Sequence, residues 1–263
     1  MALTAAQVKY LVSLTTKKGR KQEGCFIAEG IRLLEEALAG NYLPHQVLYA
    51  PALLTPRGEN LVAAFGSRKV ETKSISTREC NRLADTEHSQ GILAVFELRI
   101  VDLEQQLRKG LRRILICDRI GDPGNLGTLI RAAAAFAFDL VVTTAGSAEA
   151  VSPKTIRASA GAFFRIPIVA GTEDADLAEK LKLRKYSLYA ADLRGEEFSV
   201  TDALPDCLAL VIGSEAEGSG PALLTHADRR LRIPISTAAE SLNAAMAGTL
   251  LMFWISIRER IPS

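Results

Sequence analysis

The chain has 263 residues, a formal net charge of +2 and 48% hydrophobic residues. This length and composition suit a globular protein with one large hydrophobic core or two smaller ones. The nearly neutral charge excludes a uniformly basic nucleic-acid-binding chain, so any nucleic-acid surface must arise from local clustering of cations. The longest apolar run, near residues 250–257, is too short to span a bilayer, and no secretory signal is visible. We therefore expect a soluble, cytoplasmic protein with no membrane contact.

The four cysteines lie far apart in the sequence and show no paired spacing. They are Cys25, Cys80, Cys117 and Cys207. These spacings match neither a metal-binding motif nor the cysteine-dense pattern of small secreted domains, so we expect reduced thiols and no bound metal.

Apolar runs alternate with amphipathic segments through the first hundred residues. We predict strands at 25–28, 47–50, 73–76 and 92–98, and helices at 31–38, 53–65 and 78–84. A polar segment at 102–113 follows, and a second alternation begins at Ile114. This pattern predicts two α/β domains, residues 1–105 and 106–263, with the boundary in the polar segment.

Four cations are clustered within five residues near the N-terminus, beside a predicted loop. They are Lys17, Lys18, Arg20 and Lys21, around Gly19. Such a cluster can be an ordinary solvated charge run. It can also contact phosphates, which sets the affinity and register of RNA binding without reading the sequence.

The most informative stretch of the chain runs from Ile114 to Arg131. Ile114 begins a short apolar run typical of a buried parallel strand, and Gly, Asp and Pro residues follow it. We predict a helix next, with Asn125 as its N-cap and Arg131 about one and two-thirds turns further on. The glycines in this loop do not form a dinucleotide fingerprint, which argues against a nucleotide-dependent oxidoreductase.

Two later segments also carry polar residues directly after apolar strands. Residues 208–212 form an apolar run that delivers Gly213 and Glu215 at its carboxyl end, where open α/β sheets hold their ligands. Residues 231–236 form another short run, and Ser241-Leu242-Asn243 then opens a long helix. That helix has an apolar stripe, and the small residues at its start permit close backbone packing.

Together the three segments resemble the motifs of the SpoU (TrmH-type) RNA 2′-O-methyltransferases of the SPOUT superfamily. The residues that carry the resemblance are Asn125, Arg131, Gly213, Glu215, Gly218, Ile233, Pro234, Ser241, Leu242 and Asn243. More loosely, residues 26–30 and 88–92 resemble the substrate-binding module that precedes the catalytic domain in many SpoU enzymes. The resemblance implies a small α/β RNA-binding domain, like small ribosomal RNA-binding proteins, followed by a SPOUT parallel-sheet domain with a deep trefoil knot and a homodimer interface.

The resemblance also implies a reaction: transfer of a methyl group from S-adenosylmethionine to a ribose 2′-hydroxyl of RNA. The two-domain layout favours 23S-type ribosomal RNA as substrate, with transfer RNA as the alternative. By the same resemblance, backbone groups at Thr144, Gly213, Ile233 and Leu242 would hold the cofactor. Asn125, Arg131, Glu215, Ser241 and Asn243 would form the catalytic site. His88 and the four clustered cations would contact RNA.

The role of Arg131 is open at this point. The family often assigns this arginine the removal of the hydroxyl proton, but a free guanidinium is effectively always protonated, so positioning a phosphate and stabilising alkoxide charge is the easier role. A non-catalytic RNA-binding or ribosome-assembly protein is a second alternative. It would not need an intact cofactor pocket, so retention of the pocket residues argues against it.

Overall fold

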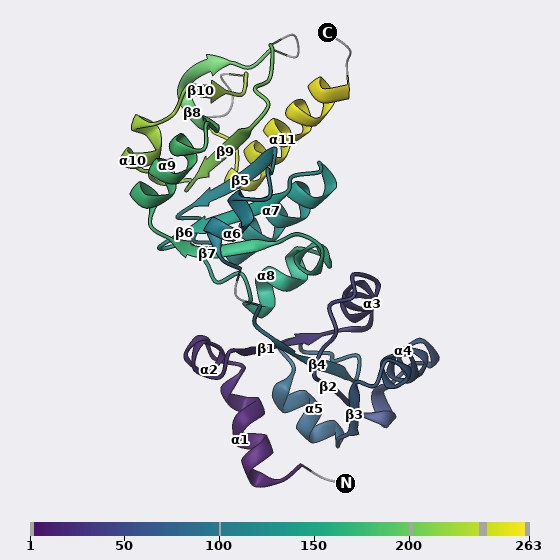
Figure 1. The fold of residues 1–263 in the computed structure, drawn as a ribbon. Coiled ribbons are helices and arrows are strands. Elements are labelled where there is room, and N and C mark those ends of the chain that lie inside the picture. Colours follow the sequence, from purple (N-terminus) through teal and green to yellow (C-terminus); the bar gives the residue numbers. More distant parts are fainter. Residues whose placement is uncertain (1–2, 100, 200–201, 237–240, 261–263) are drawn as a thin grey trace. The chain divides into compact units, whose positions relative to one another are not determined.

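The computed structural model describes residues 3–99, 101–199, 202–236 and 241–260 (Figure 1). The chain divides into two compact units. The first comprises Met1–Arg99 and Val151–Arg165, and the second comprises Ile100–Ala150 and Ile166–Ser263. We describe each unit by itself.

The first unit is built on a four-stranded mixed sheet with the order β1-β4-β2-β3. Its strands are β1 (Cys25–Glu29), β2 (Gln46–Tyr49), β3 (Glu71–Ser74) and β4 (Ile92–Glu97). β4 is antiparallel to both β1 and β2, whereas β2 and β3 are parallel. Three strands lie where the sequence pattern predicts them, because each contains a short apolar run bounded by turn residues, whereas the polar strand β3 begins at Glu71, two residues before the predicted range 73–76.

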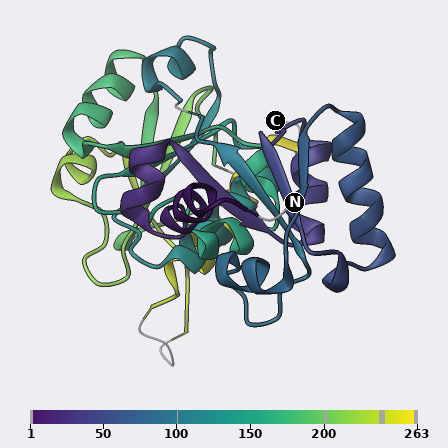
Figure 2. The ribbon, with the colours of Figure 1, turned by 90° about the horizontal axis from the view of Figure 1, so that it is seen from below.

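Helices cover this sheet. They are α1 (Ala5–Ser13), α2 (Lys17–Glu23), α3 (Ile31–Ala39), η1 (Pro51–Leu53), α4 (Pro56–Ser67), α5 (Thr77–Leu83), α8 (Pro153–Ala158) and η2 (Ala162–Phe164). α1 and α5 share a core cluster with one face of the sheet. α3 and α4 lie side by side in both views (Figures 1 and 2). The predicted helix at 53–65 begins later, at Pro56, because Thr55 caps it and a proline suits a first helical position.

A segment from the middle of the sequence, residues 151–165, packs within the first unit. The Phe163 ring lies 5.5 Å from that of Phe26, and the Phe164 ring lies 5.1 Å from that of Phe96. Arg165 also pairs with Glu36 at 2.5 Å. Burial of aromatic surface accounts for this association. The sequence predicts two continuous domains, 1–105 and 106–263, and this division stays a prediction. The compact units of the structure differ from it mainly because residues 151–165 belong to the first unit.

The second unit is built on a six-stranded sheet with the order β10-β8-β9-β5-β6-β7, in which every pair of neighbours is parallel. Its strands are β5 (Arg113–Asp118), β6 (Leu140–Thr144), β7 (Ile168–Thr172), β8 (Ser187–Glu197), β9 (Leu208–Gly213) and β10 (Arg229–Arg232). β5 and β9 lie side by side at the centre, so the loops after them meet at one edge. This edge holds the site described below.

Helices cover both faces of the parallel sheet, as such sheets require. The helices are α6 (Leu103–Leu107), α7 (Pro123–Ala135), α9 (Asp174–Leu183), α10 (Pro221–Thr225) and α11 (Ala244–Arg260). α6, α9 and α10 bury one face, while α7 and α11 pack together and α11 reaches β9. A Cβ on Gly248 of α11 would lie 2.4 Å from Leu129 and 3.1 Å from Ile212. The predicted close packing of the last helix therefore depends on this glycine.

The polar segment 102–113, for which the sequence pattern predicted no element, forms α6 after the N-cap Asp102 and ends in β5. Two sequence predictions in this unit need correction. The N-cap of α7 is Asp122, whose side chain accepts a hydrogen bond from Asn125 N, so Asn125 lies inside the first turn. α11 begins at Ala244, after the predicted start. Within the described ranges, no helix combines the length and apolar character needed to cross a membrane.

Candidate functional site

Three polar side chains from distant parts of the sequence meet at the carboxyl edge of the large sheet. Asn125 lies on the first turn of α7, Glu215 follows β9, and Asn243 precedes α11. Asn243 Nδ2 donates to Glu215 Oε1 at 2.5 Å and to Asn125 Oδ1 at 3.0 Å, and Asn125 Nδ2 donates to Glu215 Oε1 at 3.1 Å. The structure thus brings together three of the five predicted catalytic residues.

This network also determines how α11 begins. Asn243 Oδ1 accepts hydrogen bonds from Ala245 N at 3.0 Å and Met246 N at 3.2 Å, so Asn243 acts as the N-cap. Glu215 Oε1 accepts a further bond from Ala244 N at 3.2 Å. A carboxylate at a helix N-terminus is stabilised by the free N–H groups and the helix dipole. Glu215 Oε2 accepts no hydrogen bond from the described residues and is left for other partners.

The loop that carries Glu215 is closed by its own backbone. Ser214 N donates to Gly218 O at 3.2 Å, and Gly218 N donates back to Ser214 O at 2.9 Å. A Cβ at Gly213 would lie 2.1 Å from the carbonyl carbon of Gly218 and 2.2 Å from Ser219 N. Only glycine therefore fits at position 213, and the loop has little freedom.

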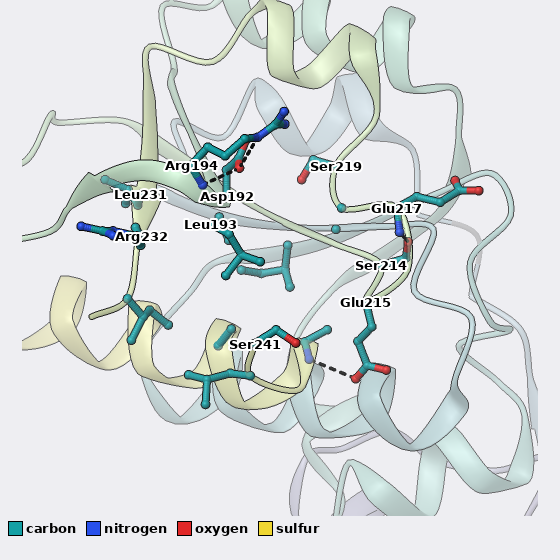
Figure 3. Close-up of a pocket in the computed structure, with 18 of the residues that line it drawn as sticks. Asp192, Leu193, Arg194, Ser214, Glu215, Glu217, Ser219, Leu231, Arg232 and Ser241 are labelled. Carbon is teal, nitrogen blue, oxygen red and sulfur yellow. Dashed lines mark hydrogen bonds and ion pairs between the residues drawn. The ribbon is translucent and has the colours of Figure 1, made fainter. Parts of the chain in front are cut away.

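Beside the network lies a pocket of about 370 Å³ (Figure 3). Its lining combines the ends of β8, β9 and β10 with the start of α11 and includes the predicted residues Gly213, Glu215, Ile233, Ser241 and Leu242. The volume falls within the range of small-molecule and cofactor sites. Ile212 and Leu231, each 1% exposed, provide apolar surface deep in the pocket. Such a lining suits a planar apolar ring with a few polar edges.

One wall of the pocket carries charge. The Asp192 carboxylate accepts hydrogen bonds from Arg194 N at 2.9 Å and Arg194 Nε at 3.3 Å, and Arg230 lies 3.6 Å away. Burial raises the pKa of Asp192, but the hydrogen bonds from Arg194 and the charge of Arg230 outweigh burial and lower it overall. Asp192 is therefore ionised at neutral pH and paired.

Behind the pocket, a fully buried carboxylate joins three loops. Asp118 ends β5 and accepts hydrogen bonds from Thr144 Oγ1 at 2.7 Å and Gly220 N at 2.6 Å. Thr144 Oγ1 in turn accepts from Arg119 N at 3.0 Å. Thr144, whose backbone was expected to hold the cofactor, is not among the residues that line the pocket, and its side chain bonds within this junction. Asp118 was not identified from the sequence, although an acidic residue at the end of an apolar strand was a usable signal.

Arg131 does not join the network within one chain. It lies six residues beyond Asn125 on α7, which corresponds to about 120° around the helix axis. Its side chain is exposed and has no hydrogen bond or ion pair among the described residues. The guanidinium is therefore free to meet a group from outside the chain.

The predicted RNA contacts all belong to the first unit. Lys17, Lys18 and Lys21 are exposed on α2, and His88 is exposed as well. Arg20 differs from the prediction, since it is 5% exposed and its guanidinium donates to Leu14 O at 3.1 Å. Because the cluster forms a helix and not a loop, every third or fourth side chain points inward, and Arg20 is the one that does.

Glu29, which lies within the stretch 26–30 that resembles the substrate-binding module, holds a neighbouring loop. It accepts hydrogen bonds from Asp85 N at 2.9 Å, Thr86 N at 3.4 Å and Thr86 Oγ1 at 2.6 Å. Because these bonds hold the loop in place, a structural role is sufficient to explain an acidic residue at the end of β1. In the part of the chain that the structure describes, no group of three or more His, Cys, Asp or Glu residues could hold a metal ion.

Two family profiles match the chain. The profile of the SpoU rRNA Methylase family matches residues 112–253, and that of the MRM3-like substrate binding domain matches residues 5–94. Among similar proteins, 23S rRNA (guanosine(2553)-2′-O)-methyltransferase RlmP of Bacillus subtilis is 31% identical over 94% of each chain. Mitochondrial rRNA methyltransferase 3 of Homo sapiens is 27% identical over 89% of this chain and 68% of its own length.

Solved structures agree with these matches over the whole chain. An AdoMet-bound rRNA methyltransferase from Sinorhizobium meliloti superposes with a TM-score of 0.84 at 26% identity, covering 100% of this chain and 99% of its own. A protein described as an RNA 2′-O ribose methyltransferase gives a TM-score of 0.81 at 28% identity, covering 99% and 98%. The family motifs and the parallel sheet of this chain therefore agree with the family profile and with these solved structures. The chain belongs to the SpoU rRNA methylase family.

Proposed function

We propose that this protein transfers the methyl group of S-adenosylmethionine to a ribose 2′-hydroxyl of ribosomal RNA. The observation that carries the proposal is the meeting of Asn125, Glu215 and Asn243 beside the pocket. These residues come from three distant segments of the sequence, and their amides and carboxylate converge on one point. Family membership supports the same reaction, and so does the buried hydroxyl of Ser219, which has no hydrogen-bond partner among the described residues and can therefore meet a cofactor.

Different residues of the chain would bind the cofactor and orient the ribose. S-adenosylmethionine, when bound, supplies a methyl group on a sulfonium, which is already a good leaving group. Ile233 and Leu242 would pack against the cofactor, and the backbone of Gly213, which also lines the pocket, would contact it. Asn125, Glu215 and Asn243 would orient the ribose so that its hydroxyl faces the methyl group, with Ser241 contributing a hydroxyl from the pocket lining.

Arg131 would act on the RNA backbone. Its exposed guanidinium can pair with the phosphate beside the reacting ribose and stabilise the negative charge that develops on the oxygen. Glu215 Oε2 would accept the hydroxyl proton, because the other oxygen of this carboxylate already holds the network together. This division leaves Arg131 charged throughout.

The substrate proposal is 23S-type ribosomal RNA. Its support is the naming of the relatives, since the Bacillus subtilis protein that matches along 94% of its length is a 23S rRNA methyltransferase. The first unit would bind the RNA, with Lys17, Lys18 and Lys21 on α2 contacting phosphates and His88 lying close to the bases or backbone. The four cysteines are free, which is consistent with the cytoplasm as its place of action.

We also propose that the second unit carries a deep trefoil knot, as the family resemblance implies, and forms a homodimer. α11 presents three large apolar side chains to solvent, Met246, Leu250 and Phe253, at positions one and two turns apart. The Phe253 ring packs 5.8 Å from that of Phe136 on the neighbouring segment. A stripe of this kind is costly in water and is typical of a protein interface. A second copy placed there would lie near Arg131, which faces outward on α7.

The test is methyl transfer from tritiated S-adenosylmethionine to separate pools of unmodified ribosomal and transfer RNA. We expect label in ribosomal RNA, resistant to base removal and located on a ribose, and no label with Arg131→Ala. Label only in transfer RNA would contradict the substrate class. Binding of RNA without binding of S-adenosylmethionine and without transfer would favour the ribosome-assembly alternative, which needs no cofactor pocket.

A further inference from the structure

Among the described residues, one buried hydroxyl of the pocket lining has no hydrogen-bond partner. Ser219 is 5% exposed, and its Oγ makes no hydrogen bond with any described residue. Two other buried nitrogens share this property, Nε of Arg113 and Nε of Arg119, but neither arginine lines the pocket and both bond through other nitrogens. A buried hydroxyl without a partner costs free energy in the unliganded protein. Ser219 is therefore a candidate for a residue that a ligand satisfies.

The backbone fixes the direction of this hydroxyl. Gly220 N donates to the buried carboxylate of Asp118 at 2.6 Å, which anchors the peptide group that follows Ser219. On the other side, Ser219 N lies against Gly213, where even a methyl group would collide with it. Figure 3 shows the Ser219 oxygen directed into the pocket, on the side of Asp192. The hydroxyl is thus held in place before any ligand arrives, which reduces the entropic cost of using it.

The surroundings of Ser219 select the kind of group that it meets. Ile212 and Leu231, each 1% exposed, line the same deep part of the pocket. A carboxylate or ammonium group placed there would lose its hydration without a charged partner, since Asp192 is already paired with Arg194 and Arg230. A neutral ring with nitrogen or hydroxyl groups at its edge loses much less. The nucleoside end of a cofactor fits this description, and the zwitterionic amino-acid end does not.

We infer that Ser219 is a specificity residue for the cofactor, and that its hydroxyl forms a hydrogen bond with the adenosine moiety of S-adenosylmethionine. This inference rests on the proposed function, because it assumes that cofactor. Ser219 and Ser241 lie on opposite walls of the pocket, and the inference assigns the wall with Ser219 to binding of the nucleoside (Figure 3). Asp118 is then a positioning residue, because it holds the backbone next to Ser219.

The experiment compares the purified full-length protein with Ser219→Ala by calorimetry and thermal melting. The ligands are S-adenosylhomocysteine and 5′-methylthioadenosine. The second ligand keeps the nucleoside but lacks the amino acid. If 5′-methylthioadenosine binds too weakly for direct calorimetry, its affinity is measured by its displacement of S-adenosylhomocysteine. We expect both ligands to lose affinity by a similar factor, roughly 3- to 20-fold, as for one hydrogen bond. Without ligand, we expect the variant to melt at the same or a higher temperature, because an unsatisfied hydroxyl has been removed.

Ser159→Ala is the matched control. Ser159 is also buried, but its hydroxyl donates to Ile156 O at 2.7 Å in the first unit, so its loss should lower the melting temperature and leave both affinities unchanged. Equal affinity of Ser219→Ala and wild type for both ligands would overturn the inference, as would a loss confined to S-adenosylhomocysteine. If the wild-type protein binds neither ligand, the proposed function itself is wrong, and this outcome is distinct from the other two.

Discussion

Asn243 donates a hydrogen bond from its side-chain amide to the side-chain oxygen of Asn125, 3.0 Å away and 118 positions earlier in the sequence. The same amide bonds Glu215, so the two asparagines and the carboxylate form one closed network. Asn243 also caps α11, which couples the start of the last helix to the site. The network is therefore both a folding contact and the frame of the proposed catalytic centre.

Replacing Glu215 should separate these two roles. Glu215→Gln keeps the shape of the side chain but removes the charge, whereas Glu215→Ala removes the acceptor for Asn125, Asn243 and Ala244 N. We expect Glu215→Ala to lower the free energy of unfolding by about 1 kcal/mol, because the side chain is exposed and water replaces part of each bond. Methyl transfer should fall at least tenfold in both variants. Urea unfolding and tritium transfer measure the two effects, and full transfer by Glu215→Gln would remove the carboxylate from the mechanism.

Replacing Arg131 should lower turnover without changing stability or cofactor affinity. Its side chain is exposed and has no partner among the described residues, so Arg131→Ala should change neither the melting temperature nor the affinity for S-adenosylhomocysteine. Turnover should fall by a factor of about 100 or more if the guanidinium stabilises charge in the transition state, a contribution of about 3 kcal/mol. Arg131→Lys should recover only part of the rate, since it keeps the charge and loses the planar fork. A large drop in stability would instead indicate a structural role.

Gly213 should tolerate no side chain. A Cβ there would lie 2.1 Å from the backbone of Gly218, so Gly213→Ala must displace the loop that carries Glu215. We expect a decrease on the order of 3 kcal/mol in the free energy of unfolding and loss of cofactor binding.

Gly66→Ala is the control for this substitution. Gly66 lies near the end of α4, and nothing stands within 4 Å of the Cβ that alanine would add. Alanine is the better helix former, so this variant should gain up to about 1 kcal/mol. If chemical denaturation gave the same free energy of unfolding for Gly213→Ala and Gly66→Ala, the close approach of Gly213 to the backbone of Gly218 would be contradicted.

The apolar stripe on α11 should hold the proposed dimer together. Phe253→Glu places a charge at the C-terminal end of that stripe, and we expect the protein to sediment as a monomer with much reduced turnover. Leu183→Glu provides the comparison, because Leu183 on α9 is even more exposed, at 83%, and lies outside the stripe. Analytical ultracentrifugation should show no change for that variant. A monomeric wild-type protein that methylates RNA normally would refute the dimer proposal.

The basic cluster of α2 should divide into RNA-binding residues and a structural residue. Replacing Lys17, Lys18 and Lys21 by Gln should weaken RNA binding at all salt concentrations tested. It should reduce the slope of log affinity against log salt by about 1 for each phosphate that the variant no longer binds. Arg20→Ala should leave that slope unchanged and lower the free energy of unfolding by about 1 to 3 kcal/mol, because the buried bond to Leu14 O cannot form. Filter binding over a salt series, with urea unfolding, distinguishes the two.

Local patterns in the sequence were sufficient for most of the secondary structure. The strands around Phe26, Ile92 and Ile114 were predicted correctly because each is a short apolar run between turn residues. Errors occurred where capping decides a boundary, as at Asp122, which caps α7 in place of Asn125. The helix that contains Arg20 was missed because its residues are mostly charged, and a charge run has no apolar period to detect.

The sequence by itself determined which residues make up the proposed site, because motif residues such as Asn125, Glu215 and Asn243 can be identified wherever the chain places them. Only the tertiary structure decided which residues face the pocket. Thr144 is turned into a buried junction with Asp118, Arg131 points away from Asn125, and the Ser219 hydroxyl is held inward without a partner among the described residues. The physical reason is that side-chain direction depends on helix phase and on loop hydrogen bonds between segments far apart in the sequence. No local pattern encodes those contacts.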